Sequence, residues 1–330
     1  MEFRTIGKSG IQTPVVAFGA WAIGGWMWGG TDDAKAVRAI HRAIDVGMTM
    51  IDTAPSYGMG HSERIVGKAI AGRRDQVIIA TKCGIRWDLE GRHDGMETTT
   101  NEGKRVTMVR CLGPESIFHE VDQSLLRLGI DRIDLYQCHW PDPSTPIAET
   151  MDALLEVQRQ GKVNAIGVSN YTTDMMRECL KKGYIASDQP QYNPLEREIE
   201  RDVLPFCRTH DIGVLAYSPI AQGLMTGKVT PERVFHEGDA RQKKPWFSVE
   251  NRRRVQAMLK TIQPIADGHQ ATLAQVAIQW VVSQPGITAA LVGARDEAQV
   301  EENARAGALK LSQDELAIIR KAVEDLGQPT

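Results

Sequence analysis

The sequence has no long apolar run, no apolar leader and no cysteine pair. No stretch approaches the ~20 apolar residues of a membrane-spanning helix, and the N-terminal segment MEFRTIGKSG lacks the apolar core of a signal peptide. The five cysteines are widely spaced and form no Cys-x-x-Cys pair, which favours reduced thiols over disulfides or a zinc site. We therefore expect a cytoplasmic protein with no membrane partner.

The sequence also lacks a strong charge of either sign. The formal net charge is -3 and no long run of Lys and Arg occurs, so a nucleic-acid partner is not expected. An apolar fraction of 42% and a charged fraction of 25% are typical of globular proteins and exclude disordered and fibrous classes. No feature of the chain indicates an oligomeric state.

Several catalytic signatures are missing. No predicted strand is followed by Gly-x-Gly-x-x-Gly, and Gly7-Lys8-Ser9 has Glu2 where a phosphate loop requires glycine. The segment 167–171 departs from the Gly-x-Ser-x-Gly elbow at Tyr171. The eight histidines are scattered and no His-Glu-x-x-His motif is present, so no metal site is expected.

What the chain does contain is an alternation of short apolar runs and amphipathic segments from end to end. Most of the runs are unbroken, as expected for strands that are covered on both faces of a parallel sheet. The candidate strands are Val15–Gly19, Thr49–Asp52, Val77–Lys82, Ile133–His139, Val163–Ser169, Ser187–Gln191, Gly213–Tyr217 and Ala289–Val292.

Helix signals lie between these strands. Pro114 opens an apolar stripe that runs from Ile117 to Leu128, and Thr272-x-x-Gln275 and Ser312-x-x-Glu315 read as capping boxes. The alternation has no compositional break, which predicts one α/β domain over residues 1–330, a closed (β/α)8 TIM barrel. An open doubly wound sheet is the alternative, disfavoured by the missing glycine fingerprint.

Two intervals are too long for plain loops. Cys83–Gly113 follows the third strand and Ser218–Ala271 follows the seventh, so both are expected over the catalytic face of the barrel. The first is polar and contains glycine, as a lid would. The chain from Leu311 onward predicts one further helix beyond the eighth unit.

Four reactive side chains follow successive predicted strands. Asp52, Lys82 and His139 stand at the ends of strands two, three and four, and Tyr57 follows Asp52 in the next loop. Adjacent strands lie about 4.8 Å apart, so these groups can converge on one site. Taken singly, each has a plainer interpretation: a helix cap, a packed ring, a solvated amine or a structural imidazole.

The combination predicts acid–base chemistry by a phenol. A free tyrosine has a pKa near 10, and we expect the ammonium of Lys82 to lower it. Asp52 would hold Lys82 charged and aimed, and His139 would hydrogen-bond a substrate oxygen. Such a group protonates a carbonyl oxygen as hydride reaches the carbon, and it works in reverse for alcohol oxidation. A Schiff-base role for Lys82 is an alternative that its pairing with Asp52 disfavours.

Over essentially its whole length the sequence resembles the aldo-keto reductases, in particular bacterial general-stress and sugar-reductase-like members. The motifs that carry the resemblance are Gly47-Met-Thr-Met-Ile-Asp-Thr-Ala-Pro-Ser-Tyr-Gly58, Ser62-Glu63-x-x-x-Gly67, Ile79-Ala-Thr-Lys82, Asp134-Leu-Tyr-Gln-Cys-His-Trp-Pro141, Gly161-Lys162, Ile166-Gly-Val-Ser-Asn170 and Gln191-Tyr-Asn193. The resemblance implies a (β/α)8 barrel, NADPH-dependent reduction of carbonyl compounds and Tyr57 as general acid.

The resemblance also implies the cofactor contacts. Those expected at the nicotinamide and the pyrophosphate are Trp21, Asp52, Ser169, Asn170, Gln191, Tyr217, Ser218, Pro219, Ile220, Gln222, Gly223, Leu224 and Lys228, and those at the adenosine end are Gly293, Arg295, Gln299, Glu302 and Asn303. Arg295 would bind a 2′-phosphate. Because Gly293 stands where many relatives have lysine, NADH is a possible second cofactor. The alternatives are a core aromatic at Tyr217, a helix cap at Ser169–Asn170, and surface pairing of Arg295 with Asp296 or Glu297.

The substrate is expected among aromatic side chains. Trp26 and Trp28 follow the first strand, and Trp87 and Trp140 follow the third and fourth, which suggests an apolar pocket wall for a small carbonyl compound. Plugging of the barrel mouth is the alternative for each of them. Sugars, aliphatic aldehydes, aromatic ketones and polyols all remain candidates. The family resemblance also allows a cofactor-binding regulator like the β-subunits of potassium channels.

Overall fold

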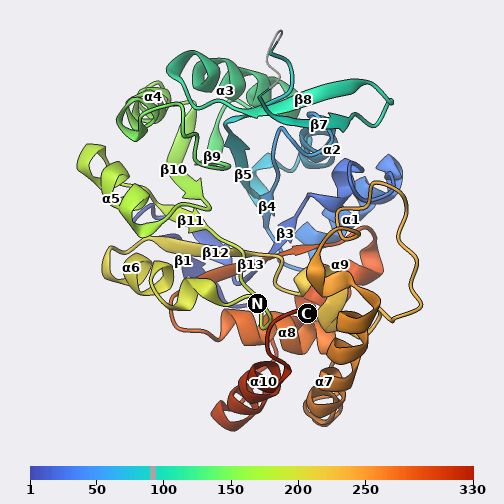
Figure 1. The fold of residues 1–330 in the computed structure, drawn as a ribbon. Coiled ribbons are helices and arrows are strands. Elements are labelled where there is room, and N and C mark those ends of the chain that lie inside the picture. The colour runs from blue at the N-terminus through green and yellow to red at the C-terminus, as the bar shows by residue number, and fades with distance from the viewer. Residues whose placement is uncertain (90–93) are drawn as a thin grey trace.

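Eight parallel strands close into a barrel in the computed structural model, which describes residues 1–89 and 94–330 (Figure 1). The strands are β3 (Val16–Gly19), β4 (Met50–Asp52), β5 (Ile78–Cys83), β9 (Ile133–Cys138), β10 (Val163–Ser169), β11 (Ser187–Gln189), β12 (Gly213–Tyr217) and β13 (Ile287–Gly293). Each lies beside the next in chain order, and β13 pairs with β3 to close the ring. The predicted single-domain (β/α)8 barrel is confirmed.

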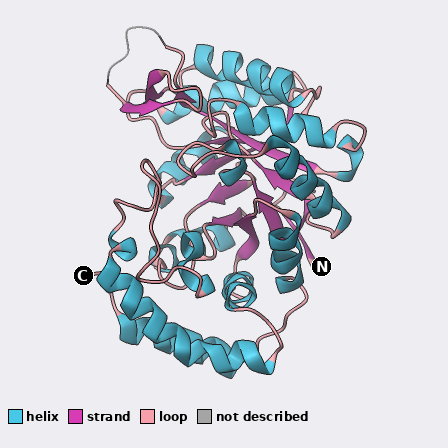
Figure 2. Cartoon of the chain, turned by 90° about the vertical axis from the view of Figure 1, so that its right-hand side faces the viewer, coloured by secondary structure: helices cyan, strands magenta, loops and turns pink. Residues whose placement is uncertain are grey.

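Helices surround the barrel on its outside, as the turned view shows (Figure 2). They are α1 (Asp33–Asp45), α2 (His61–Ile70), α3 (Pro114–Leu128), α4 (Ile147–Arg159), α5 (Thr173–Lys182), α6 (Val203–Thr209), α7 (Val249–Gly268), α8 (Leu273–Val282), α9 (Glu297–Ala306) and α10 (Gln313–Leu326). Short 3-10 turns are η1 (Ala22–Gly24), η2 (Arg74–Gln76), η3 (Glu198–Glu200), η4 (Ala221–Thr226) and η5 (Pro245–Phe247). Within the described ranges, no helix combines the length and the apolarity needed to traverse a bilayer.

The core has two layers because successive strand residues face opposite sides. In β3, Val16 and Phe18 pack outward against the helices, while Ala17 belongs to the inner cluster. Small inward side chains such as Ala17 fit the narrow interior of an eight-stranded barrel. The amino-terminal end of the barrel is sealed by the hairpin β1 (Phe3–Thr5) and β2 (Gln12–Pro14), whose loop contributes Ile6 and Ile11 to the inner cluster.

The two long intervals contain secondary structure of their own. The interval after β5 forms a small antiparallel sheet of β6 (Ile85–Arg86), β7 (Met96–Thr99) and β8 (Arg105–Arg110); residues 90–93 of the expected lid lie outside the described part. The interval after β12 contains η4, η5 and α7. Trp26 Nε1 donates to Thr98 Oγ1 at 2.9 Å, so the small sheet contacts the loop after β3.

Two strand boundaries differ from the sequence-based expectation by two residues, and several others differ by one. The sixth barrel strand ends at Gln189 rather than Gln191 because Pro190 has no N–H to donate to the ladder, and β13 begins at Ile287. Both capping boxes, at Thr272 and Ser312, are present. The extra C-terminal helix is α10, which packs against α7 on the outside of the barrel (Figure 1).

Candidate active site

The four predicted reactive residues meet at the carboxyl ends of the barrel strands. Asp52 ends β4, Lys82 lies near the end of β5, and His139 follows β9. Lys82 Nζ lies 2.7 Å from Asp52 Oδ2 and 3.4 Å from Tyr57 Oη. The rings of Tyr57 and His139 stand edge to face, with centroids 5.7 Å apart. The sequence-based grouping of these four side chains therefore corresponds to one cluster in space.

Every N–H of Lys82 has an acceptor. An ammonium carries three donors, and those of Lys82 point to Asp52 Oδ2, to Tyr57 Oη and to the backbone oxygen of Thr53 at 2.9 Å. The Lys82 side chain is fully buried and that of Asp52 is 5% exposed. The amine is thus locked in position, and the Tyr57 oxygen accepts rather than donates in this contact.

Sequence reasoning missed two amides that support Asp52. Gln189 Nε2 donates to Asp52 Oδ1 at 2.8 Å, and Gln137 Nε2 lies 3.5 Å from the same oxygen. Both glutamines are buried, on β11 and β9. The available signal was their polarity inside otherwise apolar strand segments near the catalytic end, because a buried polar side chain requires a partner.

The pKa of Tyr57 in the cluster is not lowered as expected. Burial, with a further contribution from the charge of Asp52, raises the pKa of Tyr57 well above its ordinary value. Burial also lowers the pKa of Lys82, opposed by Asp52, and burial together with Lys82 lowers the pKa of His139 well below its usual value. The expected lowering of the Tyr57 pKa therefore does not appear, because burial, the larger cause, and the nearby charge of Asp52 both favour the neutral phenol. At neutral pH Tyr57 is protonated and His139 is uncharged.

Ser169, Asn170 and Tyr217 form a second polar group beside the cluster. Asn170 Nδ2 donates to Ser169 Oγ at 3.0 Å and to the backbone oxygen of His139 at 3.1 Å, and Tyr217 Oη donates to Asn170 Oδ1 at 3.0 Å. The N-cap of α5 is Thr172, so neither Ser169 nor Asn170 caps that helix. Tyr217 is only partly buried, which also disfavours the core-aromatic interpretation.

Gln191 does not join this group in the structure. It lies beyond the end of β11, and its Nε2 donates to Glu196, which also accepts from Asn193 Nδ2 at 2.8 Å. Gln189, two residues earlier, is the glutamine that reaches Asp52.

The turn after β12 is held in unusual backbone conformations. Ser218, Ala221 and Gln222 are non-glycine residues with φ of 54°, 49° and 52°, a strain that concentrates at ligand-binding sites. Among the described residues no partner lies within hydrogen-bond distance of the buried Gln222 Oε1. A strained turn of this kind is typical of a ligand-binding site. Of the other expected contacts here, Pro219, Ile220 and Gly223 lie in or beside this turn, and Leu224 is buried in the outer core.

At the expected adenosine end, cationic side chains contact other parts of the chain. Lys228 Nζ lies 3.2 Å from Glu302 Oε2, and Arg295 donates to the backbone oxygens of Trp28 and Gly30. The surface pairing considered for Arg295 is not observed, since Asp296 pairs with Lys35 at 3.3 Å and Glu297 with Arg38 at 3.2 Å. Gln299 Oε1 accepts from Arg295 N at 2.9 Å, and Asn303 Nδ2 donates to Gly293 O at 3.2 Å.

The expected substrate-pocket tryptophans divide into two groups. Trp28 lies edge-on to Trp21 with centroids 5.1 Å apart, and Trp21 lies 6.3 Å from the Tyr57 ring. Trp26 contacts the small sheet as described above. The recorded ring contacts of Trp140 and Trp87 are instead with Arg110 and Arg127, at 5.3 Å and 6.0 Å.

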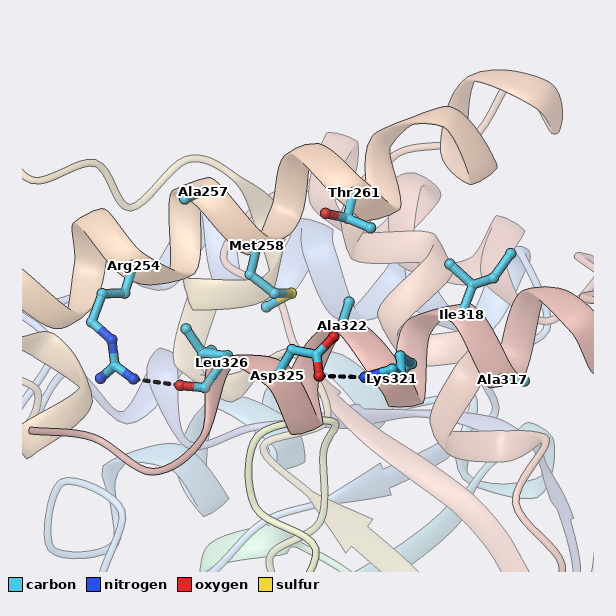
Figure 3. Close-up of a pocket in the computed structure, with 10 residues that line it drawn as sticks. All are labelled: Arg254, Ala257, Met258, Thr261, Ala317, Ile318, Lys321, Ala322, Asp325 and Leu326. Atoms are coloured by element: carbon cyan, nitrogen blue, oxygen red, sulfur yellow. Dashed lines mark hydrogen bonds and ion pairs between the residues drawn. The ribbon is translucent and has the colours of Figure 1, made fainter.

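A surface groove lies away from this site. About 720 Å³ in volume, it runs between α7 and α10 on the outside of the barrel and is lined by residues such as Met258, Ile318 and Leu326 (Figure 3). None of the expected site residues borders it. In the described parts of the chain, no group of three His, Cys, Asp or Glu side chains is arranged to hold a metal.

With this geometry in place, comparison with known proteins identifies the family. The model of the Aldo/keto reductase family matches residues 15–324. The chain belongs to this family. It is accordingly an NAD(P)H-dependent oxidoreductase of the kind that acts on small carbonyl compounds.

Individual relatives cover nearly the full chain. The NADH-specific methylglyoxal reductase of Escherichia coli is 39% identical over 99% of this chain and 99% of its own length. A probable voltage-gated potassium channel subunit beta of Arabidopsis thaliana is 32% identical over 93% and 91%. The solved structure of the glycerol dehydrogenase AKR11B4 from Gluconobacter oxydans is 38% identical, covering 98% of this chain and 94% of its own, with a TM-score of 0.85.

Proposed function

We propose that this aldo/keto reductase reversibly reduces small aldehydes and ketones, with NADPH as preferred cofactor, NADH as a second one, and Tyr57 as proton donor. The observation that carries the proposal is the contact of Lys82 Nζ with Tyr57 Oη at 3.4 Å and with Asp52 at 2.7 Å. It joins a buried phenol to a fixed ion pair at the mouth of the barrel, where enzymes of this fold carry out chemistry.

Each member of the cluster has a distinct role in this proposal. Because the Tyr57 oxygen accepts from Lys82, its own O–H remains available for a substrate oxygen. Ser56 Oγ lies 3.3 Å from His139 Nδ1, which leaves Nε2 to hydrogen-bond the same substrate oxygen. The bound nicotinamide supplies the hydride. Tyr57 then gives its proton to the developing alkoxide, and Lys82 stabilises the phenolate that remains.

The cofactor preference rests on Arg295. Its recorded side-chain contacts are with the carbonyls of Trp28 and Gly30, and within the described residues no carboxylate forms a salt bridge with it, although Asp239 lies close enough to act on its charge. A guanidinium in this state suits bidentate binding of a 2′-phosphate. The E. coli relative is named as NADH-specific, and Gly293 replaces a lysine found in many members, which supports NADH as the second cofactor.

The substrate class follows from the pocket and from the named relatives. Trp21 and Trp28 provide apolar walls beside Tyr57, and the relatives are named for methylglyoxal and glycerol, both three-carbon compounds. We therefore propose short polar carbonyl compounds as substrates, with sugars as a further group to assay. The cytoplasm is the proposed location, supported by cysteines that are all free thiols, and residues 1–330 are proposed to act as one unit.

Replacement of the phenol tests the proposal. Tyr57→Phe removes the donated proton and should reduce kcat by about 10²–10⁴-fold, the usual range for a general acid, while NADPH binding measured by fluorescence persists. Tyr184→Phe is the matched control, because that hydroxyl lies at the opposite end of the barrel, bonded to Lys8 N at 2.6 Å. Retained turnover of methylglyoxal, glyceraldehyde and a sugar by Tyr57→Phe would contradict the assignment.

The same assays separate the alternatives. A cofactor-binding regulator would bind NADPH yet give no steady-state rate with any aldehyde of the panel. A Schiff-base mechanism would attach the carbonyl compound covalently to Lys82 upon borohydride reduction. The three hydrogen bonds that occupy the Lys82 amine argue against such an attachment.

A further inference from the structure

Residues 26–30, which follow η1 and are called the tryptophan loop below, are held from two sides by arginines. Arg295, before α9, donates to the backbone oxygens of Trp28 and Gly30, the latter at 3.0 Å. Arg241, in the segment after β12, lies over the Trp28 ring with its guanidinium carbon 4.8 Å from the centroid. Ala240 N also donates to Met27 O at 3.1 Å. Segments far apart in sequence thus close on one short loop.

The two arginines differ in what neutralises them. Arg241 forms an ion pair with the buried carboxylate of Asp239 at 2.7 Å. Arg295 instead contacts uncharged carbonyl oxygens. The Asp239 carboxylate, which is paired with Arg241, acts on its charge without a recorded salt bridge, and the nearby Arg241 and Arg233 carry charge of the same sign. A phosphate dianion is a stronger partner for a guanidinium than two backbone carbonyls. The present contacts of Arg295 are therefore ones that an anion can displace.

The tryptophan loop can move when Arg295 releases it. Met27, Gly29 and Gly30 all have positive φ, and the space around Gly30 is open. Movement would not stay local, because Trp28 packs edge-on against Trp21, and Trp21 lies beside the Tyr57 ring. A contact chain therefore leads from Arg295 to the proposed catalytic phenol.

We propose that the 2′-phosphate of NADP(H) competes with the backbone carbonyls of Trp28 and Gly30 for Arg295, so that the phosphorylated cofactor releases the tryptophan loop and moves the Trp28 indole. This inference rests on the proposed binding of NADP(H) at Arg295. The inference adds that binding of the 2′-phosphate changes the substrate side of the site. NADH, which has no 2′-phosphate, leaves the tryptophan loop bound to Arg295. Arg295 then determines cofactor specificity and also controls the position of the loop.

Tryptophan emission with two adenosine nucleotides tests the proposal without turnover. Adenosine 2′,5′-bisphosphate should change the emission of the wild-type protein, and adenosine 5′-monophosphate should not. Trp28→Phe should lose most of that change. Arg295→Gln should bind the bisphosphate at least about ten-fold more weakly, as expected for loss of a charge-assisted hydrogen-bond pair, and its emission without ligand should already differ from wild type. Arg305→Gln, an exposed arginine on α9, the helix that follows Arg295, is the matched control.

Two results would overturn the inference in different ways. If calorimetry shows that the bisphosphate binds while Trp28 emission stays unchanged, or if Trp28→Phe retains the full change, the loop is not released and the cofactor assignment survives. If the bisphosphate does not bind more tightly than the monophosphate, the proposed preference for NADPH falls as well.

Discussion

The catalytic cluster and the adenosine end of the expected cofactor site are built in opposite ways. At the cluster the ion pair of Lys82 and Asp52 is buried, with side-chain exposures of 0% and 5%. At the adenosine end the pair of Lys228 and Glu302 has exposures of 67% and 21%, and Arg295 contacts backbone carbonyls. The first pair is fixed among barrel strands, whereas the cationic groups of the second region have partly exposed or uncharged partners.

This difference follows from where the residues lie in the fold. Asp52, Lys82 and the supporting Gln189 are on barrel strands, which hold side chains rigidly, whereas Lys228 and Arg295 are on connecting segments. A buried pair is held strongly, because removing one partner leaves an unpaired charge in a medium of low dielectric constant. An exposed pair contributes little and is exchanged readily for another partner. On the proposed function, the barrel combines a rigid reaction centre with cofactor-binding cations whose present contacts are readily exchanged.

The largest effect is expected when the buried ion pair of Lys82 and Asp52 is broken. Lys82→Met leaves the Asp52 carboxylate buried without its cation, which should cost about 3–5 kcal/mol of unfolding free energy. Turnover should fall as well, because the Tyr57 phenolate loses its stabilising ammonium. Denaturant unfolding and steady-state rates measure the two effects.

A paired variant provides the control for this change. Lys82→Met with Asp52→Leu removes both charges, so it should recover part of the lost stability but none of the lost turnover. If Lys82→Met were as stable as the wild-type protein, the contrast between the two regions would not hold.

A smaller effect is expected in the pH dependence of reduction. Because burial and Asp52 raise the pKa of Tyr57, the phenol keeps its proton through the neutral range, and His139, with a lowered pKa, stays uncharged. The kcat/KM for reduction should change by less than about two-fold there and decline only as pH rises towards the high Tyr57 pKa. Oxidation, which needs the phenolate, should rise with pH.

Removing the charge of Asp52 gives a sharper test of the pH dependence. Asp52→Asn deletes a charge that raises the Tyr57 pKa, so the alkaline decline of reduction should move to lower pH. A decline already at neutral pH in the wild-type protein would mean that Lys82 outweighs burial and Asp52.

The rigid region is also the one that sequence reasoning predicts well. Unbroken apolar runs identify all eight barrel strands, and reading their ends brings Asp52, Lys82 and His139 together. The predicted strand end at Gln191 lies two residues beyond the end of β11 at Gln189, because Pro190 has no N–H for the ladder, although Gln191 still forms one parallel bridge with Tyr217. The direction of the Tyr57 pKa shift could not be predicted, because it depends mainly on the burial of the phenol and further on its distance from Asp52, and both come only from coordinates.

The loops were predicted less well for a physical reason. The contacts of Arg295 with Trp28 and Gly30 join positions more than 260 residues apart through backbone carbonyls, which every residue possesses. No side-chain pattern marks such a partner. The small sheet after β5 was likewise read as a polar loop, since its strands are short and largely exposed.

The smallest effect is expected from removing the exposed ion pair of Lys228 and Glu302. Glu302→Gln frees Lys228 from its ion pair, so a cofactor pyrophosphate no longer has to displace a carboxylate. Exposed pairs are worth about 0–1 kcal/mol, so the Kd for NADPH should fall by no more than about five-fold, and less at high salt. Glu301→Gln is the matched control, because its carboxylate pairs with Arg42 on α1 at 2.8 Å instead. Weaker NADPH binding by Glu302→Gln would mean that Glu302 holds the cofactor directly, and this carboxylate would then belong to a prebuilt site like that of Lys82 and Asp52.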